Sequence, residues 1–534
     1  MKHDGIFKIA PQGVGAIKGN VAAMGMKAFD LSRMARLGLP VPPAFVLGTA
    51  HCRLSNQDPE RYGKNLAGLL EEQLIWLQSI TGFGFGDTRK PLLISVRSGA
   101  SVSMPGMMDT LLNIGLCDAT ARGLLRITGN PRLVWDSYRR LIQDFAEVVF
   151  SASSQPFAAA LDAMLAREWL DRTQELDYLN LAELTQTYLQ LFGELTGRPF
   201  PQNPLEQLEL AVKAVLASCN SPRAIEYRRL YGLPDDLCTA VTIQQMVFGN
   251  AGGTSGAGVG FTRDPDTGEK KLYFDFLFNS QGEDVVSGRT ACSDAERLFL
   301  ALPETEQTLL AICAALEQEY GDAQEFEFTL QDGVLYLLQT RTAKRTPWAA
   351  LRIAVEQVRE GLVGKNDALA RLSGLVLGDI QRQWLSLEED QPLCQGQPAG
   401  IGVAAGPLAL DIEAARRFSV EGRPAVLVRE EMATADISGI ALSAGVLTAR
   451  GNRTSHAAVV ARQLGKACVT GCSTLLIDPA RRVVTFGERT LAEGELITLD
   501  SNTGRVFAGE ASVVVDYPTQ WLAEVEKWRQ SPDQ

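Results

Sequence analysis

The sequence lacks several features that would assign it to a common class. None of its 534 residues lies in an apolar run near the ~18 residues that a membrane-spanning helix needs. The first residues have no apolar core of the kind that signal peptides carry. The net charge of −12 argues against binding to nucleic acid, which requires a positively charged face. We therefore expect a cytoplasmic protein with no membrane segment and no nucleic-acid partner.

Cysteine and histidine are also sparse. The nine cysteines are scattered and form no C-x-x-C pair, which indicates reduced thiols instead of a disulfide framework or a zinc site. The histidines are His3, His51 and His456. For His51, in the segment Thr-Ala-His-Cys, we expect a surface or capping role. No P-loop of the form G-x-x-x-x-G-K-[ST] occurs, so a bound nucleotide would need another device.

What is present is an ordinary globular composition. Hydrophobic residues make up 46% and charged residues 21%, and the length fits three to four domains. The pattern over 119–232 is mostly helical, with apolar residues at intervals of three and four. Helices are also expected over 348–385 and 519–529, and the Pro/Gly/Gln-rich segment 391–400 is a linker candidate. Strands are predicted at 92–96, 241–247, 271–278, 325–330, 334–339, 425–428, 446–449, 467–470, 483–486 and 496–499.

Two of these strands, 325–330 and 334–339, are predicted to form a hairpin. Asp332 and Gly333 lie between them, and an Asp-Gly pair favours a tight turn. Alternation along the strands would point Glu327 and Gln339 to one face if the register pairs them. Magnesium prefers such oxygen ligands and keeps phosphate oxygens and water as further ligands. The hairpin is therefore a candidate magnesium site.

The third histidine stands at the predicted start of a helix. His456 follows a predicted buried strand and a Gly-Asn turn, and either Thr454 or Ser455 can cap the helix that begins there. Backbone N–H groups and the positive end of the helix dipole favour an anion at this place. A largely neutral imidazole is nucleophilic at cellular pH. A structural histidine is the alternative to a phosphoryl carrier, and the surrounding sequence decides between them.

The segment 447–471, LTARGNRTSHAAVVARQLGKACVTG, resembles the phosphohistidine signature of the phosphoenolpyruvate-utilising enzymes, most closely that of the pyruvate phosphate dikinases. The resemblance implies that His456 becomes phosphorylated. It also places Thr454 at a position that is reversibly phosphorylated in some regulated members. The sequence departs from the family directly before Thr454, where Arg453 adds a positive charge beside the carrier.

Three further segments resemble the ATP-grasp nucleotide-binding region of the same family. The first, 24–43, matches Lys27 to the family's phosphate-contacting lysine. The second, 95–110, contains Arg97, which can bind phosphate oxygens in two places, and a Ser-Met-Pro-Gly loop that could close over phosphates. The third covers 243–281, and its first residues would form the edge that adenine contacts: Gln245, Met246 and Val247.

The resemblance assigns further residues to the nucleotide and the metal. Glu327 and Gln339 match positions that bind the metal and the phosphates, and Arg341 matches another functional arginine. Catalytic roles are thus implied for His456, Arg97 and Arg341, with ATP and Mg²⁺ as cofactors. The other positions expected to contact the nucleotide are acidic: Asp275, Glu283 and Glu325.

The fold implied by the resemblance is an α/β multidomain fold. It combines an ATP-grasp-like nucleotide-binding domain, which contains a helical insertion, with a swivelling β/α phosphohistidine domain. The expected boundaries are 1–118 and 236–345 for the two parts of the nucleotide domain, 119–235 for the insertion, 346–399 for a helical linker, 400–512 for the phosphohistidine domain and 513–534 for a tail.

The activity implied is that of a dikinase-type phosphotransferase. ATP, with inorganic phosphate, phosphorylates His456 and gives AMP and pyrophosphate, and the phosphoryl group passes to pyruvate or another small acceptor. Too few residues follow His456 for the family's acceptor-binding β/α barrel, so we expect a separate acceptor-binding subunit. The alternatives are a subunit like phosphoenolpyruvate synthase or phenylphosphate synthase, using water or another acceptor, and a non-catalytic regulatory phosphocarrier. The oligomeric state is open, with a homodimer as one option.

Overall fold

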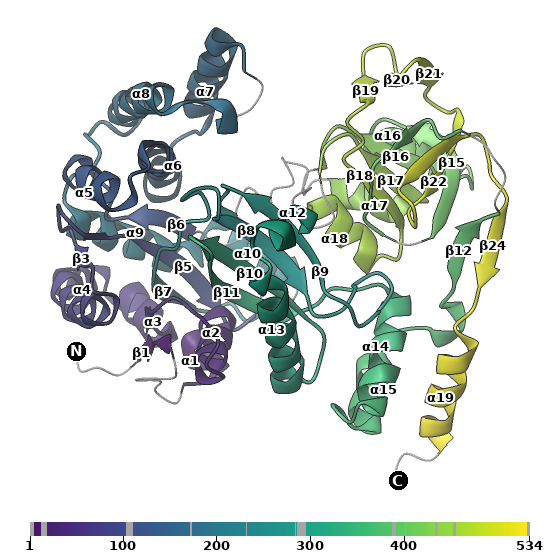
Figure 1. Ribbon diagram of the computed structural model, residues 1–534, viewed down its shortest axis with the longest axis horizontal. Coiled ribbons are helices and arrows are strands. Elements are labelled where there is room, and N and C mark those ends of the chain that lie inside the picture. The colour runs from purple at the N-terminus through teal and green to yellow at the C-terminus, as the bar shows by residue number, and fades with distance from the viewer. Residues whose placement is uncertain are drawn as a thin grey trace. The chain divides into compact units, whose positions relative to one another are not determined.

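The computed structural model describes residues 5–11, 19–102, 110–170, 173–230, 232–282, 285, 295–386, 391–400, 402–432, 436–451 and 455–530. The chain divides into two compact units. Unit 1 comprises Met1–Gly252 with Leu330–Gln339, and unit 2 comprises Gly253–Thr329 with Thr340–Gln534. Figure 1 labels the elements of both units.

A five-stranded antiparallel sheet lies at the centre of unit 1, in the order β1-β2-β7-β5-β6. Nearly every residue of β2, β5 and β7 is buried, because helices and neighbouring strands cover them. The strands are β1 (Ile6–Ile9), β2 (Ala44–Leu47), β5 (Ile94–Ala100), β6 (Thr110–Ile114) and β7 (Thr239–Gln245), and a short parallel pair consists of β3 (Gly84–Phe85) and β4 (Pro91–Leu92).

Several helices of unit 1 begin at polar caps. Asp58 accepts a hydrogen bond from the N–H of Arg61 at the start of α4, and Asn130 accepts one from Leu133 at the start of α6. Proline occupies the first turn of both helices, where its missing N–H costs nothing. The helices are α1 (Val21–Met24), α2 (Met26–Arg36), α3 (Thr49–Gln57), α4 (Pro59–Thr81), α5 (Asp118–Thr128), α6 (Pro131–Phe150), α7 (Gln155–Glu168), α8 (Tyr178–Thr196), α9 (Pro204–Ser218) and α10 (Pro222–Leu230).

The core of unit 1 joins the sheet to its helices, and it also contains a histidine. His51 on α3 is only 2% exposed, and its Nδ1 lies 3.2 Å from the hydroxyl of Tyr62. The expected surface or capping role is therefore wrong. The reason is that α3 packs on β7 and α9, so the face that carries His51 and Cys52 turns inward. Burial lowers the pKa of His51, which favours the neutral ring.

A four-stranded sheet in the order β11-β10-β8-β9 follows, and the division between the units runs through its β10–β11 hairpin. Asp332 and Gly333 connect the two strands with φ values of 52° and 79°, which confirms the predicted tight turn. The strands are β8 (Gly256–Phe261), β9 (Tyr273–Phe278), β10 (Gln324–Gln331) and β11 (Val334–Thr342), and the helices α12 (Ala295–Ala301) and α13 (Glu304–Tyr320) lie between β9 and β10 in the chain.

Alternate glycines of β8 let phenylalanine rings pack against its backbone. A Cβ on Gly258 would lie 2.4 Å from the ring of Phe328, and a Cβ on Gly260 would lie 2.5 Å from the ring of Phe326. Only glycine avoids both clashes. This part of the glycine-rich segment is therefore a packing surface in the core of unit 2.

Helices and a two-stranded ribbon connect the sheets of unit 2. Arg263, fully buried, forms ion pairs with Glu317 on α13 and with Glu356 and Glu360 beyond it. The sequence did not indicate the ribbon, whose strands are about 130 residues apart and pair antiparallel from Arg382–Asp516 to Leu385–Val513. These elements are α14 (Pro347–Arg359), α15 (Lys365–Leu372), β12 (Arg382–Leu385), β24 (Val513–Asp516) and α19 (Thr519–Gln530).

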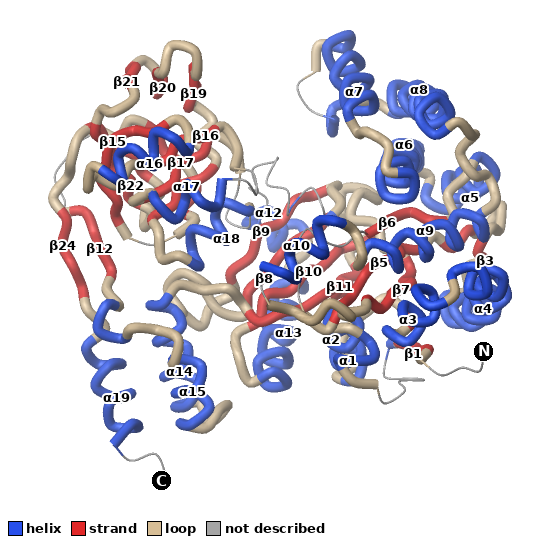
Figure 2. Tube along the Cα trace, turned by 180° about the vertical axis from the view of Figure 1, so that it is seen from behind, coloured by secondary structure: helices blue, strands red, loops and turns tan. Residues whose placement is uncertain are grey.

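The last layer is an eight-stranded sheet in the order β13-β23-β22-β15-β16-β17-β18-β14. Its centre, β15 to β18, is parallel, and one helix lies between each pair of successive strands in the chain. Figure 2 shows α16, α17 and α18 against these strands. The elements are β15 (Val403–Ala409), α16 (Ile412–Val420), β16 (Val426–Arg429), α17 (Ile437–Leu442), β17 (Gly445–Thr448), α18 (His456–Gln463), β18 (Ala467–Thr470), β22 (Leu496–Asp500) and β23 (Arg505–Ala508).

The segment 391–400, expected to be a linker, forms edge strands of this sheet. In it β13 (Cys394–Gln395) pairs with β23, and β14 (Gln397–Pro398) pairs with β18. A separate three-stranded sheet consists of β19 (Leu475–Asp478), β20 (Val483–Phe486) and β21 (Arg489–Ala492). Among the described residues, no helix is both long enough and apolar enough to span a bilayer.

Candidate active site

Unit 1 brings Lys27 and Arg97 to the same corner of its sheet. Gly25 caps α2 with a φ of 75°, and a Cβ on it would lie 2.0 Å from the carbonyl oxygen of Gly99. Glycine is thus required where the start of α2 meets the end of β5. Arg97 lies two residues before Gly99 and on the same side of the strand. Lys27 follows in the first turn of α2 with an exposed side chain, whereas Arg97 is half-buried.

The expected adenine edge lies where β7 ends. Gln245, Met246 and Val247 are half-buried, between fully buried neighbours on both sides. The N–H of Met246 donates to the carbonyl of Leu93 at 2.9 Å, and the N–H of Gln245 donates to Pro43 at 3.0 Å. Both amides are therefore occupied by protein partners. Recognition of a base at this edge would have to use the carbonyl groups or the amide of Val247.

In unit 2, the predicted site residues on β9, β10 and β11 carry charges of both signs. Arg341 forms an ion pair with Glu325, and the carboxylate of Glu327 also acts on its charge. Burial lowers the pKa of Arg341, but the two carboxylates outweigh burial and raise it. Asp275, on β9, is 2% exposed. The predicted Glu283 and the Ser-Met-Pro-Gly loop lie outside the described residues.

Lys344 belongs to this charged group, and the sequence analysis missed it. Its side chain is half-buried two residues after β11 ends. Burial lowers its pKa, and the charge of Arg341 lowers it further, against the opposing effect of Glu325. A cation held beside another cation is typical of a place that receives a strongly negative ligand. The Gln-Thr-Arg-Thr-Ala-Lys-Arg run at 339–345 was the available signal, but only Gln339 and Arg341 were singled out from it.

The candidate metal ligands are one carboxylate and one amide. Glu327 on β10 and Gln339 on β11 both have half-buried side chains. Among the residues that the structure describes, no three His, Cys, Asp or Glu side chains gather to hold a metal ion. Magnesium commonly takes one or two protein oxygen ligands and completes its shell with phosphate oxygens and water. The donor set of Glu327 and Gln339 fits an ion that arrives with a nucleotide.

His456 is the first residue of α18, as predicted. The preceding strand, β17, is parallel to β16 and β18, and ligands bind at the carboxyl ends of strands in such sheets. Ser455 occupies the N-cap position with an extended backbone, but its side chain makes no capping hydrogen bond. The helix start therefore keeps backbone N–H groups for another acceptor. Thr454, the proposed regulatory residue, lies outside the described part of the chain.

Two hydroxyl groups beside this helix start have no hydrogen-bond partner within the described residues. They are Oγ of Ser455 and Oγ1 of Thr448, and both side chains are more than nine-tenths buried. A Cβ on Gly451 would lie 3.3 Å from the Ser455 hydroxyl and 3.5 Å from the Thr448 hydroxyl, so both flank this glycine. A buried hydroxyl without a partner is costly unless a ligand or water satisfies it. The sequence predicted Ser455 only as a possible helix cap and gave no indication that Thr448 belongs to the site.

The far end of α18 is fixed by a buried ion pair. Nε of Arg462 lies 2.7 Å from Oδ1 of Asp266, in the loop after β8, and Arg462 is 1% exposed. Burial alone would lower the pKa of Arg462, but the Asp266 carboxylate raises it. Arg462 also lies over the ring of Phe261. The helix that begins with His456 is thus tied to the β8–β9 part of unit 2.

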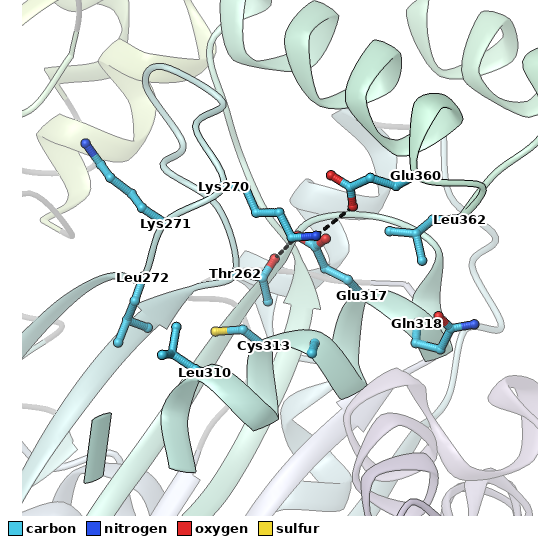
Figure 3. A pocket seen from close by; sticks show the side chains of 11 residues that line it. Thr262, Lys270, Lys271, Leu272, Leu310, Cys313, Glu317, Gln318, Glu360 and Leu362 are labelled. Atoms are coloured by element: carbon cyan, nitrogen blue, oxygen red, sulfur yellow. Dashed lines mark hydrogen bonds and ion pairs between the residues drawn. The ribbon is translucent and has the colours of Figure 1, made fainter. Parts of the chain in front are cut away.

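A cavity of about 470 Å³ in unit 2 contains none of the predicted site residues. In Figure 3, Thr262 contacts Glu317 and Lys270 contacts Glu360, whereas Lys271 extends away from the group. Glu317 is further neutralised by Arg263. The charges around this cavity therefore satisfy one another, and it is not the candidate phosphate site.

These features define a mixed α/β multidomain protein that has a histidine at a helix start and clusters of arginine, lysine and carboxylate side chains. Two family models match the chain: "Pyruvate phosphate dikinase, AMP/ATP-binding domain" over 69–299, and "PEP-utilising enzyme, mobile domain" over 421–504. The candidate phosphohistidine lies within the second match. The chain belongs to the family of pyruvate phosphate dikinases and other PEP-utilising enzymes.

Several curated relatives are similar over almost the whole chain. Pyruvate, phosphate dikinase from Clostridium symbiosum is 40% identical over 491 residues, which cover 91% of this chain and 56% of the relative. The chloroplastic pyruvate, phosphate dikinase 1 of Oryza sativa subsp. japonica is 43% identical, over 96% of this chain and 56% of the relative. Pyruvate, phosphate dikinase from Rhizobium meliloti is 40% identical, over 95% of this chain and 58% of the relative. The chain thus spans little more than half the length of these relatives.

Proposed function

We propose that the chain is an ATP-dependent phosphotransferase of the dikinase type, with His456 as the phosphoryl carrier. Inorganic phosphate takes the γ-phosphoryl group and becomes pyrophosphate. The imidazole of His456 takes the β-phosphoryl group, and AMP leaves. A second transfer moves the phosphoryl group from His456 to an acceptor and restores the free imidazole.

The observation that carries this proposal is the place of His456 in the fold. It begins a helix at the carboxyl end of a parallel strand, where the amides at the helix start are not used by a side-chain cap. Such a helix start stabilises negative charge on a group that the imidazole carries. The match to an AMP/ATP-binding family model supports ATP as the phosphoryl donor to this carrier.

Phosphoryl transfer depends mainly on positioning and charge neutralisation. The remaining candidate residues would position the phosphates and neutralise their charge. Lys27, Arg97 and Arg341 would contact phosphate oxygens, and Lys344, which the sequence did not indicate, would add positive charge. Glu327 and Gln339 would hold Mg²⁺, which would neutralise negative charge on the phosphates. We assign these residues to an ATP-grasp-like domain, and the β/α domain around His456 to a swivelling domain that moves between donor and acceptor.

The acceptor proposed here is pyruvate, which the names of the relatives contain. The expectation of a separate acceptor-binding subunit has no support in the comparisons, because the part of each relative beyond the match belongs to the same polypeptide. We therefore propose that transfer to pyruvate uses a domain of the kind that the relatives carry beyond this match. The choice of phosphate over water as co-substrate rests on the Ser-Met-Pro-Gly-Met-Met motif in the sequence.

ATP labelled at its β-phosphate tests the proposal. Purified protein with Mg²⁺ and inorganic phosphate should acquire an acid-labile, base-stable label, with one equivalent of AMP formed per label. When phosphate is left out, almost no label should form on the protein. A label that forms equally well without phosphate would indicate a water-using enzyme. Absence of label under both conditions would favour a non-catalytic phosphocarrier and would end the proposal.

A further inference from the structure

Three cysteines from distant segments meet in the core of unit 1. Cys52 lies on α3 and Cys219 follows the end of α9, and their sulfur atoms are 3.5 Å apart although 167 residues separate them in the sequence. Cys238 directly precedes β7, and its thiol interacts with Cys52. The chain has nine cysteines in 534 residues, so three in one place is a local concentration that needs an explanation.

The cluster is buried on one side and reaches toward solvent on the other. Cys52 is 0% exposed and Cys219 is 1% exposed, whereas Cys238 is half-buried. A metal site does not explain the cluster, because no group of three potential ligands with suitable geometry occurs in the described residues. Reduced thiols at these positions would only fill the core, whereas sulfur atoms in van der Waals contact can also be oxidised to a disulfide.

The electrostatic surroundings of the two sulfur atoms differ. The hydrogen bond between Cys52 and Cys219 lowers the pKa of Cys219 against the effect of burial, and the positive charge of Arg228 acts in the same direction. Arg228, itself 3% exposed, donates a hydrogen bond to the carbonyl of Cys219. Cys52 is affected in the opposite sense, because its bond to Cys219 and burial raise its pKa. These directions favour Cys219 as the thiol that reacts first.

We propose that Cys52 and Cys219 form a reversible disulfide when the protein meets a hydroperoxide. The Cys219 sulfur attacks one oxygen of hydrogen peroxide, the O–O bond breaks, and the first water leaves a sulfenic acid on Cys219. The Cys52 sulfur then attacks the Cys219 sulfur, the S–O bond breaks, and the Cys52 proton leaves with the oxygen as a second water. Two thiols lose two electrons in total, and one peroxide gains them.

The geometry needs little change for this step. A disulfide requires an S–S distance of about 2.05 Å, and the two sulfur atoms already lie 3.5 Å apart. The bond would join α3 to α9, and both helices pack on β7. β7 pairs along its length with β5, which carries Arg97, and the hydroxyl of Thr239 accepts a hydrogen bond from Gly99 at 3.1 Å. The disulfide would therefore stiffen the support of the candidate phosphate-binding corner.

Peptide mapping of the full chain tests the proposal. The reduced protein is treated with hydrogen peroxide, free thiols are alkylated, and the digest is analysed without reduction. We expect a peptide pair that links Cys52 to Cys219 and disappears after dithiothreitol. The pair should be absent in C52A and in C219A and should persist in C238A, the matched control from the same cluster. Oxidation should raise the Tm of the wild type, and this rise should exceed the Tm change on oxidation of C219A by roughly 4 °C or more.

A link between Cys52 and Cys238 in place of the expected pair would overturn the proposal. So would oxidation of Cys219 to a sulfinic acid with no link to Cys52, or a wild-type chain without any link. Circular dichroism and the Tm under reducing conditions show whether the alanine variants are folded. If a variant does not fold, the mapping of the wild type alone decides the outcome. The result is independent of His456 phosphorylation, because no nucleotide takes part.

Discussion

Arg462 and Asp266 form a fully buried ion pair, with Nε of the arginine 2.7 Å from Oδ1 of the aspartate. Arg462 lies six residues after His456 on α18, and Asp266 lies in the loop that follows β8. α18, which begins with the proposed phosphoryl carrier, is thus held at its other end by the Asp266 carboxylate in the β8–β9 loop. A buried pair of this kind contributes more to the choice of one arrangement than to net stability.

Removal of one partner of this pair should be costly. Arg462→Met leaves the Asp266 carboxylate buried without its cation, and we expect the free energy of unfolding to fall by about 3–5 kcal/mol. The double variant R462M/D266N should recover much of this loss, because no uncompensated charge remains. Urea denaturation measures both. Arg417→Met, at a half-exposed arginine 3.1 Å from Glu493, is the control and should cause a much smaller change. Equal losses for the two arginines would contradict this account.

The pairing of Arg341 with Glu325 predicts a catalytic defect without unfolding. Arg341→Met removes a cation from the candidate phosphate site, and we expect His456 labelling to slow by roughly 100-fold or more. Glu325 is only 7% exposed and loses its cation in this variant, so circular dichroism and the Tm must show that R341M is folded before rates are compared. Rapid-quench measurement of label formation tests this. Arg345→Met, which breaks the nearby Arg345–Asp322 pair, is the control and should retain most of the rate. Similar rates for R341M and wild type would remove Arg341 from the site.

Lys344 should affect nucleotide affinity. Burial and Arg341 lower its pKa, so a phosphate that approaches both cations relieves their repulsion. We expect K344M to raise the KM for ATP several-fold and K344R to restore it largely, because the charge is kept. Steady-state AMP formation over a range of ATP concentrations measures both. A KM that does not change in K344M would show that this side chain does not face the nucleotide.

The hydroxyl of Thr448 should matter to the phosphorylated state. T448V keeps the shape of the side chain and removes the unsatisfied hydroxyl, and we expect the phosphohistidine to form or persist about tenfold less well. The decay of isolated phosphoprotein, followed as loss of acid-labile label, gives the measurement. Ser443→Ala is the control, since its buried hydroxyl already donates to the carbonyl of Gly439 at 2.7 Å. If T448V and wild type decay at the same rate and form label equally fast, the hydroxyl has only a structural role.

Acid sensitivity of unit 1 should depend on Asp136. Burial tends to raise its pKa, but Arg140, Arg139 and Arg132 outweigh burial and depress it below the ordinary value of about 3.9. The unfolded chain therefore binds more protons than the folded one between the two pKa values. This stabilising contribution is complete above pH ~4–5 and is lost as pH falls toward the folded pKa. We expect D136N to be less stable at neutral pH and to lose less stability on acidification, as seen by thermal unfolding from pH 3 to 7. An identical pH slope in D136N would contradict this.

Much of the local structure could be predicted because it is determined by short patterns. The β10–β11 hairpin follows from two apolar runs around Asp332 and Gly333, and α18 begins at His456, where the sequence predicted a helix start. The pairing of β12 with β24 could not be predicted, since the strands are about 130 residues apart and neither alternates clearly. Burial of His51 could not be predicted either, because it depends on which face of α3 packs on β7, a strand distant in the chain.

The candidate site was predicted less completely than the fold. Residues that occur in recognisable motifs, such as Arg97, Glu327 and His456, could be proposed as site residues from the sequence. Lys344, Thr448 and Asp266 were not, because their relevance comes from neighbours distant in the chain or from burial of a polar group. The occupied amides of Gln245 and Met246 likewise depend on strands that only the fold brings together.

The central claim is that His456 carries a phosphoryl group, and ³¹P NMR of the intact protein tests it most directly. After incubation with ATP, Mg²⁺ and inorganic phosphate and removal of small molecules, the wild type should show one phosphoramidate resonance that disappears at low pH. The folded variant H456N should show none, while C238A, altered far from α18 in the sequence, should match the wild type. A phosphoramidate signal that persists in H456N, or a wild type that never acquires one, would contradict the account.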